Sequence, residues 1–285
     1  MSNDQILSGY HRVQAIGRAT HLAQQLTLDR SVVVKEVGAS HHVFPHTALP
    51  EVLTHIQIEV RKAARLSHPN IVPIIEADIS RVPAYVVYEH VDGQSLRQAL
   101  EQGPLPPDRA TQLLLQVLHG LRSAHRREVF HGGLGPESVL IDTMGNARIA
   151  DFGLGALHCL GARHPLHVDT GPVAYVAPEA LGQSFSATAQ GDLFAVGILF
   201  YEALAGRIPG RRARPPTALH SELSPSFDEI FNRLTLDDPS RRYQSVDQVL
   251  EDCDYSDVKI QGMRGTQACF FFDRGDGAAA PAPEV

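Results

Sequence analysis

The periodicity of the apolar residues changes along the chain, and this change constrains the fold more than any other feature of the sequence. Residues 8–38 alternate between apolar and polar types and are rich in β-branched residues such as Val32 to Val34, which is typical of strands. From Ala110 to Ala124, apolar residues recur at intervals of 3, 4, 7, 8 and 11, the stripe of a half-buried helix. The sequence therefore predicts an α+β protein with a strand-rich first part and a mostly helical second part.

Shorter signals complete the first part. Pro50 suits the first turn of a helix, where its missing N–H costs nothing, and apolar residues at helical spacing continue this helix to Leu66. Apolar runs at 71–75 and 84–88 predict two further strands. The first part is thus expected to be a sheet with one helix.

The second part has equally clear local signals. Pro107 and Asp108 are typical of a helix start, with Asp108 as a plausible cap for the helix that contains residues 110–124. The segments 139–141 and 148–150 flank a turn at 144–146 and predict a hairpin that delivers Asp151. These signals predict a helical lobe with a small hairpin at its edge.

Composition excludes several functional classes. The chain has 285 residues, 43% of them hydrophobic, enough for one large core or two modest ones. Its formal charge of −7 argues against a nucleic-acid surface. Three scattered cysteines (Cys159, Cys253, Cys269) fit a reducing, cytoplasmic location, and residues 1–14 are too polar for a signal peptide. The apolar run 193–205 is too short for a membrane span and contains Gly197 and Glu202, so it predicts a buried helix.

Several short motifs follow one another in a fixed order over roughly residues 8–255. The most informative are His131 to Ser138, Asp151-Phe152-Gly153 and Ala177-Pro178-Glu179, which resemble the catalytic loop, the metal-binding motif and the Ala-Pro-Glu motif of protein kinases. The chain resembles the bacterial Ser/Thr (Hanks-type) protein kinase domain. Further matches are Val32 to Lys35, Glu59, His68 to Val72, Tyr85 to Glu89, Asp92 to Leu96, Asp192 and Asp238 to Tyr243.

This resemblance implies the α+β, bilobal kinase-like fold, with an antiparallel sheet and one helix in the N-lobe and a mostly helical C-lobe. The expected boundaries are an extension at 1–7, a kinase-like domain at 8–256 and a tail at 257–285 whose last part is disordered. Within the domain, the N-lobe is expected at 8–88, the hinge at 89–93 and the C-lobe at 94–256.

The catalytic loop departs from the family at the positions that carry the chemistry. The family reads His-Arg-Asp-Leu-Lys-Pro-Glu-Asn, whereas Gly132, Gly133, Gly135 and Ser138 replace Arg, the catalytic Asp, Lys and Asn here. A lost general base costs on the order of 10²–10⁴ in rate. Pro172 stands where a bracing threonine is usual. The resemblance thus implies a pseudokinase, without catalytic residues, that acts as a signalling scaffold or allosteric regulator; the alternative is a weak or atypical ATP-dependent kinase or a nucleotide-binding switch.

The residues that would hold a nucleotide are partly retained. The resemblance implies that Lys35 pairs with Glu59 and that Asp151 binds a metal ion, with Ser138 as a weak second ligand. Around any bound nucleotide it places Gly17, Lys35, Glu89, Val91 and Leu140.

The segment above the phosphates is degraded. Residues 17–22 keep one glycine of three, so the close approach of the backbone to phosphate is expected to be lost. Gln24 stands where the family usually has valine and Val33 where it usually has alanine, and both replacements are expected to disfavour a purine. Two interpretations stay open: weak binding of ATP with magnesium, or a Lys35–Glu59 pair that orders its helix without any cofactor.

Other motif residues are expected to be structural. His131 and Phe152 match an internal stack of the family, and Asp192 is expected to accept hydrogen bonds from the backbone near His131. Glu179 and Arg242 are expected to form a buried ion pair that holds the C-lobe.

The expected partners are other proteins, with an active kinase or a signalling complex as candidates, and neither nucleic acid nor a membrane span. The favoured surface is the middle of the activation segment, His158 to His167, where Leu160, Leu166 and His167 would contact a partner. The aromatic run Cys269 to Phe272 is a second candidate. Small-molecule phosphotransferases, whose loop reads His-Gly-Asp, fit less well because they lack the Ala-Pro-Glu and late-domain motifs.

Overall fold

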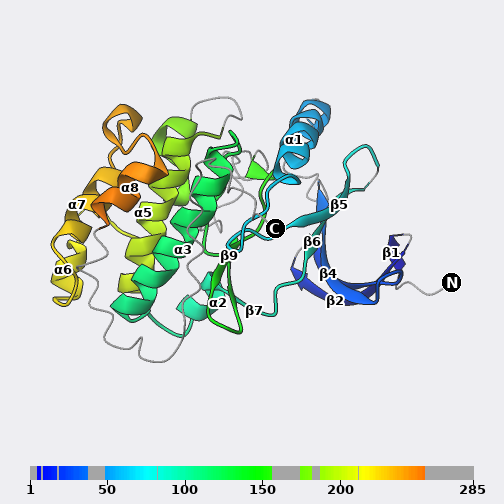
Figure 1. The fold of residues 1–285 in the computed structure, drawn as a ribbon, viewed down its shortest axis with the longest axis horizontal. Coiled ribbons are helices and arrows are strands. Elements are labelled where there is room, and N and C mark those ends of the chain that lie inside the picture. Colours follow the sequence, from blue (N-terminus) through cyan, green and yellow to red (C-terminus); the bar gives the residue numbers. More distant parts are fainter. Residues whose placement is uncertain are drawn as a thin grey trace, which may run out of the picture.

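The strand-rich first part forms one antiparallel sheet, as its alternation predicts. The protein was analysed as a computed structural model, which describes residues 5–7, 9–17, 19–37, 49–81, 83–155, 174–181, 187–210 and 212–253. The sheet lies in the first of two lobes (Figure 1) and has the strand order β1-β2-β3-β4-β6-β5. Its strands are β1 (Gln5–Leu7), β2 (Tyr10–Gly17), β3 (Thr20–Gln25), β4 (Arg30–Val37), β5 (Ile74–Asp78) and β6 (Ala84–Glu89).

One predicted strand begins later than expected. The run 71–75 was expected to be extended throughout, but β5 starts only at Ile74. Ile71 instead forms an isolated parallel bridge with Ile149 in the second lobe. An apolar run alone does not tell whether its backbone pairs within its own sheet or with another one.

Alternating side chains of this sheet serve two separate apolar clusters. One face buries Tyr10, Val32, Val34 and Val87, and a Tyr10 hydroxyl on β2 donates to Glu76 on β5 at 2.7 Å, which links distant strands of the sheet. The opposite face packs against helix α1 (Leu49–Ala63), whose Ile56 and Val60 are buried with Val86 and Tyr88 as the helical spacing predicts.

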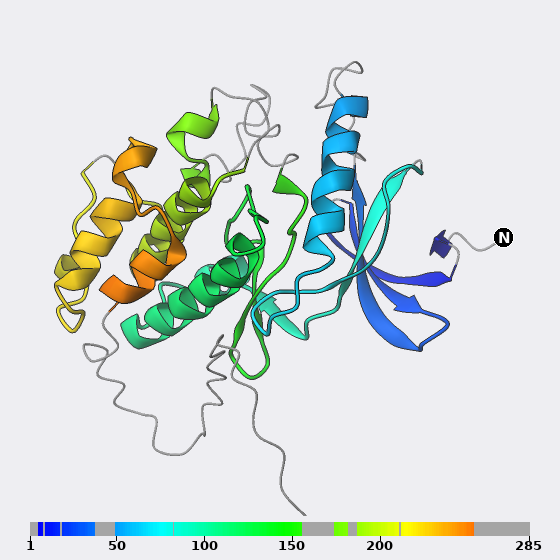
Figure 2. The same cartoon turned by 45° about the horizontal axis from the view of Figure 1, so that its top comes forward.

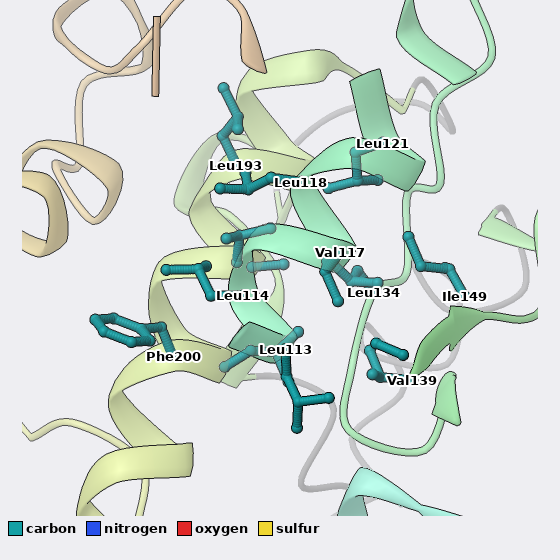
Figure 3. Packing of buried hydrophobic residues seen from close by; sticks show 14 of the residues in the cluster. Leu113, Leu114, Val117, Leu118, Leu121, Leu134, Val139, Ile149, Leu193 and Phe200 are labelled. Atoms are coloured by element: carbon teal, nitrogen blue, oxygen red, sulfur yellow. The ribbon is translucent and has the colours of Figure 1, made fainter. Parts of the chain in front are cut away.

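The second lobe is built around two long helices. Its elements are β7 (Gly93–Ser95), α2 (Leu96–Leu100), α3 (Pro107–His125), β8 (Val139–Asp142), β9 (Ala147–Ile149), η3 (Pro178–Leu181), α5 (Ala189–Ala205), α6 (Pro216–Leu219), α7 (Ser226–Leu234), η4 (Pro239–Arg241) and α8 (Val246–Asp252). Figure 3 shows the predicted stripe of α3 packed on α5, with Leu114 and Leu118 close to Leu193 and Phe200. The predicted α+β, two-lobed fold is confirmed.

The start of α3 differs from the prediction in one detail. Pro106 is the N-cap, without a side-chain hydrogen bond, and Asp108 lies inside the first turn. A carboxylate there is still favourable because it faces the positive end of the helix dipole.

Helix α5 is apolar on all sides and almost entirely buried, as residues 193–205 predict. Thr188 caps its start by accepting from the N–H of Gly191, and Gly206 ends it in a left-handed conformation with φ of 67°. Within the described residues, no helix is both long and apolar enough to cross a membrane.

The two lobes are joined by the chain itself and by contacts of the segment that follows α1. Strand β6 ends at Glu89 and β7 begins at Gly93, so the covalent connection is short. The segment that follows α1 also docks on the second lobe (Figure 2): Asn70 donates its side-chain amide to the Ala147 carbonyl at 2.7 Å, and its own carbonyl accepts from Ile149 at 2.8 Å. Gly120 of α3 permits this contact, since a Cβ there would lie 3.0 Å from the Asn70 carbonyl oxygen. The position of α1 is therefore tied to the C-lobe.

Two histidines at this junction make its stability depend on pH. Burial and the neighbouring His119 lower the pKa of His68, whose Nδ1 accepts a hydrogen bond from the Asn70 N–H at 3.1 Å. Burial and the Arg122 cation lower the pKa of His119. Both imidazoles are thus kept neutral in the folded state.

We expect acidification to weaken the fold through these two groups. Since their folded pKa values lie below the ordinary 6.5, the unfolded chain binds more protons, and stability falls as the pH drops through 6.5 toward the lowered values. In urea unfolding between pH 7.5 and 5.5, the free energy of unfolding should fall less for the double variant His68→Asn, His119→Gln than for the unsubstituted protein. Parallel curves would contradict this origin of the pH dependence.

Candidate functional site

The hairpin β8–β9 places Asp151 between the lobes, as its sequence predicts. The Asp142 carboxylate accepts from the backbone N–H groups of Met144 at 3.0 Å and Asn146 at 2.7 Å, which fixes the turn. Two residues beyond β9, Asp151 has a φ of 68° and is only 4% exposed. A buried carboxylate of this kind requires a partner.

That partner is Lys35 on β4. The Lys35 Nζ lies 2.5 Å from both carboxylate oxygens of Asp151, with 25% of the Lys35 side chain and 6% of the Asp151 side chain exposed. The predicted Lys35–Glu59 pair is therefore wrong: Glu59 instead accepts from Lys62, one helical turn further along α1, at 2.9 Å. A local i,i+3 partner satisfies Glu59 without any movement of the helix toward Lys35.

Helix α1 contacts the Asp151-Phe152-Gly153 turn directly. Gly153 has a φ of 87°, and a Cβ there would lie 2.9 Å from the Val60 Cα, so only glycine allows the two backbones to be this close. Leu154 is buried in the same cluster as Ile56 and Val60. The position of α1 and the conformation of this turn are thus mechanically linked.

The loop at 131–138 keeps its hydrogen bonds but not its reactive side chains. Gly133 offers only its backbone, whose N–H donates to His131 Nδ1 at 3.3 Å. The buried Ser138 hydroxyl donates to the Gly135 carbonyl at 2.9 Å and accepts from the Gly135 N–H at 3.1 Å. The predicted weak metal ligand is therefore used inside the loop, and the structure does not favour it as a ligand.

Asp192 holds the backbone of this loop, in the role expected for it. Its carboxylate accepts from the N–H groups of His131 and Gly132, each at 2.8 Å, and from the His125 ring at 2.8 Å. Burial alone would raise the pKa of Asp192, but His125 and the His131 N–H keep it below its ordinary value.

His131 and Phe152 stack as expected, with ring centroids 4.9 Å apart. His131 Nε2 lies 2.8 Å from the Ala150 carbonyl oxygen, which can only accept, so Nε2 carries the proton and Nδ1 is the acceptor for Gly133. Phe152 is 1% exposed and belongs to the C-lobe core. The internal stack of the resemblance is present although the catalytic aspartate is absent.

The residues expected around a nucleotide lie along the edge between the lobes. Val91 and Leu140, together with Val33, are partly buried against the N-lobe cluster that contains Tyr88. The Tyr88 hydroxyl donates to the Phe152 carbonyl at 3.3 Å, and burial and the Asp151 charge raise its pKa.

The two remaining nucleotide positions have different environments. Glu89 pairs with Arg148 of β9 at 2.6 Å, so its carboxylate is used in a contact between the lobes. Gly17 ends β2 and pairs with Thr20 of β3. Of the five expected positions, the apolar Val91 and Leu140 are partly buried beside the N-lobe cluster, whereas Lys35 and Glu89 are each held in an ion pair.

Sequence reasoning missed a polar cluster beside the loop. Arg97 of α2 contacts Glu137 at 2.9 Å, the buried Glu202 of α5 at 2.8 Å and the Tyr175 hydroxyl at 3.0 Å, and Tyr175 in turn donates to Glu202. Burial and Glu202 raise the pKa of Tyr175. The signal was Glu202 itself, since a charge within the apolar run 193–205 requires a buried partner.

The expected ion pair at the base of the C-lobe is present. Arg242 has no exposed side-chain surface and donates to both carboxylate oxygens of Glu179 at 2.7 Å. Its remaining donors reach the carbonyls of Leu236, Gln190 and Asp237. This pair fixes η3, which contains the Ala-Pro-Glu glutamate, to the end of the domain.

Several predictions lie outside the described residues. They concern Pro172, the surface from His158 to His167 and the run Cys269 to Phe272. Within the described part of the chain, no group of three or more His, Cys, Asp or Glu side chains is arranged to hold a metal ion.

Together, a two-lobed fold, a strand lysine facing the metal-motif aspartate and a loop held by Asp192 define the class of protein kinase-like proteins. The protein kinase domain family matches residues 15–258, and the chain belongs to this family.

Its relatives include bacterial serine/threonine-protein kinases. The chain is 30% identical over 248 residues to the serine/threonine-protein kinase PrkC of Bacillus subtilis, covering 81% of this chain and 37% of that protein. It is 31% identical over 231 residues to PknL of Mycobacterium bovis, covering 76% and 56%. The chain thus spans between a third and somewhat more than half of these relatives.

The solved kinase domain of Mycobacterium tuberculosis PknI has the same fold. It superposes with a TM-score of 0.69 at 20% identity, covering 88% of this chain and 98% of the PknI chain.

The observed pairing of Lys35 predicts opposite results for two substitutions. Lys35→Met leaves the buried Asp151 without its cation and should lower the free energy of unfolding by about 2–3 kcal/mol, below the ~3–5 kcal/mol of a fully buried pair because Lys35 is partly exposed. Glu59→Gln removes only a surface helix pair and should change it by less than about 0.5 kcal/mol. Urea unfolding of both variants measures this difference. A large effect of Glu59→Gln, comparable to that of Lys35→Met, would restore the Lys35–Glu59 pair.

Proposed function

We propose that this chain is a protein pseudokinase, a signalling scaffold or allosteric regulator that transfers phosphate inefficiently or not at all. The observation that carries this proposal is the loop at 131–138. Its backbone is held by Asp192 in a fixed geometry, yet the position of the general base, Gly133, has no side chain. Phosphoryl transfer depends on positioned charges, so the missing carboxylate and the missing loop lysine at Gly135 both remove stabilisation.

No described neighbour is arranged as a replacement base. Glu137 follows Gly133 by four residues, but its carboxylate is paired with Arg97. Asp192 is fully used by backbone and imidazole donors. Asp151 is neutralised by Lys35. Each of these carboxylates would have to leave a partner before it could accept a proton from a substrate hydroxyl.

Nucleotide binding is proposed to be weak and not required for the fold. A triphosphate would have to draw Lys35 away from Asp151, and a magnesium ion would have to displace the same ammonium group from the carboxylate. ATP with magnesium, if bound, would use Lys35 and Asp151 for its phosphates and its metal ion.

The alternative is a weak or atypical Ser/Thr kinase. Two observations favour it: the relatives are named serine/threonine-protein kinases, and Lys35 and Asp151 face each other as nucleotide-binding groups would. The two functions differ in whether phosphate is transferred, which can be measured.

We expect no phosphotransfer above background. The purified protein, given radiolabelled ATP, magnesium or manganese and a generic acceptor such as myelin basic protein, should label neither itself nor the acceptor. Lys35→Met is the matched control, because any residual label from a contaminating kinase would be equal in both samples. Label that is present with the unsubstituted protein and lost with Lys35→Met would establish the alternative.

Thermal-shift titration with ATP tests nucleotide binding separately. A ligand at 100 times its Kd stabilises by about 2.7 kcal/mol, roughly 5–11 °C for a domain of this size. We expect millimolar ATP to shift the melting temperature by far less, and magnesium to add nothing, because the ion must compete with Lys35. A full shift that requires magnesium and disappears in Asp151→Asn would instead identify a nucleotide-binding switch.

A further inference from the structure

Cationic side chains gather where the segment after α1 meets the end of α3. We call this group the junction cluster; it comprises Arg65, His68, His119, Arg122, Arg126 and Arg127. Arg127 donates to the Arg65 carbonyl at 2.9 Å, which brings the two lobes together at this point. Beyond the effect of burial, His119 lowers the pKa of His68 and Arg122 lowers the pKa of His119.

The cluster carries more positive than negative charge. Asp247 of α8 is shared by Arg122, at 2.6 Å, and Arg126, at 3.5 Å. Arg127 is bonded to a carbonyl rather than to a carboxylate, and the exposed Glu128 follows it in the chain. Among the described residues, the Arg65 guanidinium has no hydrogen bond or ion pair. Arg65 and Arg127 are therefore exposed cations available to an incoming anion.

This surface differs from the average of the molecule. The chain has 25 Lys and Arg against 32 Asp and Glu, a formal charge of −7. A local excess of arginine against that background is not a consequence of composition. Arginine presents a planar set of donors that matches carboxylates. The overall negative charge repels a nucleic acid or an anionic membrane, each with many charges, more than a short acidic segment that contacts only this surface.

The histidines agree with an anion site. Burial lowers the pKa values of both histidines, with a further contribution from His119 at His68 and from the Arg122 cation at His119, so both are neutral while the surface is free. The titratable or charged group that acts on His68 is His119, and the one that acts on His119 is Arg122, which is itself paired with Asp247 of α8. A carboxylate placed here would reverse the effect of the Arg122 cation.

We propose that the junction cluster docks an acidic polypeptide segment of a partner protein. The site spans both lobes, since Arg65 and His68 follow α1 while the other four residues belong to α3 or its end. An acidic segment bound there would clamp the segment after α1 to α3 and so bias the position of α1. The proposal rests on the scaffold function proposed above and names the chemistry of one partner.

One other basic run competes for the same role. Arg207, Arg212 and Arg214 follow α5 near the opposite end of α3, where the Leu105 N–H donates to the Ala203 carbonyl at 2.7 Å. The 19 residues of α3 separate the two regions by about 28 Å. This run belongs to one surface loop, whereas the junction cluster gathers cations from distant segments, which favours the junction as a built site.

Fluorescence anisotropy with a labelled oligoglutamate peptide tests the proposal at low salt, where exposed charges act most strongly. The double variant Arg65→Gln, Arg127→Gln should weaken binding at least about tenfold, or ~1.4 kcal/mol. Its matched control, Arg207→Gln, Arg212→Gln, removes the same charge and should weaken binding less than about twofold. Arg65→Gln alone should also weaken binding, and it removes no intramolecular contact described here, so a folding defect cannot mimic the result.

Three results would overturn the proposal: no binding by the unsubstituted protein, equal losses in both double variants, or tighter binding of duplex DNA or phosphatidylglycerol vesicles than of the peptide. These results leave the phosphotransfer assay unaffected. Detectable kinase activity would conversely refute the pseudokinase function while peptide binding could still be observed at the junction.

Discussion

A single buried carboxylate, that of Asp192, determines the backbone geometry on which the candidate site depends. It accepts from two successive N–H groups of the loop and from His125, so its charge is satisfied although it is 1% exposed. The loop so held places His131 against Phe152 and Ala150. None of these contacts uses a side chain at 133, 135 or 138. The loop can therefore keep its shape after the residues that perform chemistry are replaced.

Much of the fold could be predicted because it follows from local patterns or from ordered motifs. The stripe of α3, the hairpin before Asp151 and the apolar helix α5 are each encoded within a short stretch of sequence. The Glu179–Arg242 pair joins residues 63 positions apart, and only the resemblance to kinases linked them. Spacing alone carries no information on such a contact.

The parts that could not be predicted are choices between partners. In the protein kinase family two carboxylates are candidate partners for the lysine at position 35, here Asp151 and Glu59. The orientation of α1, which is a tertiary property, decides which of them pairs with Lys35. Glu59 has a local alternative in Lys62, which the helical spacing allows. Likewise, Glu202 within an apolar run indicates that a buried partner exists. That partner, Arg97, lies 105 residues away in the sequence, and only the fold brings the two side chains together. Long-range polar contacts are specified by the assembled fold.

Two contacts between the lobes act on the same element. Lys35 reaches Asp151 from the sheet, and the Asp151 turn touches Val60 of α1 through Gly153. The segment after α1 is bound to α3 and β9 through Asn70 and Arg127. A molecule that drew Lys35 away from Asp151 would bias α1 through Val60 in its last turn, and a protein bound to the junction cluster would bias it through the segment that follows the helix. Neither action requires a catalytic base. Under the proposed function, a kinase fold without Asp at position 133 would relay binding at one surface to another through the position of this helix.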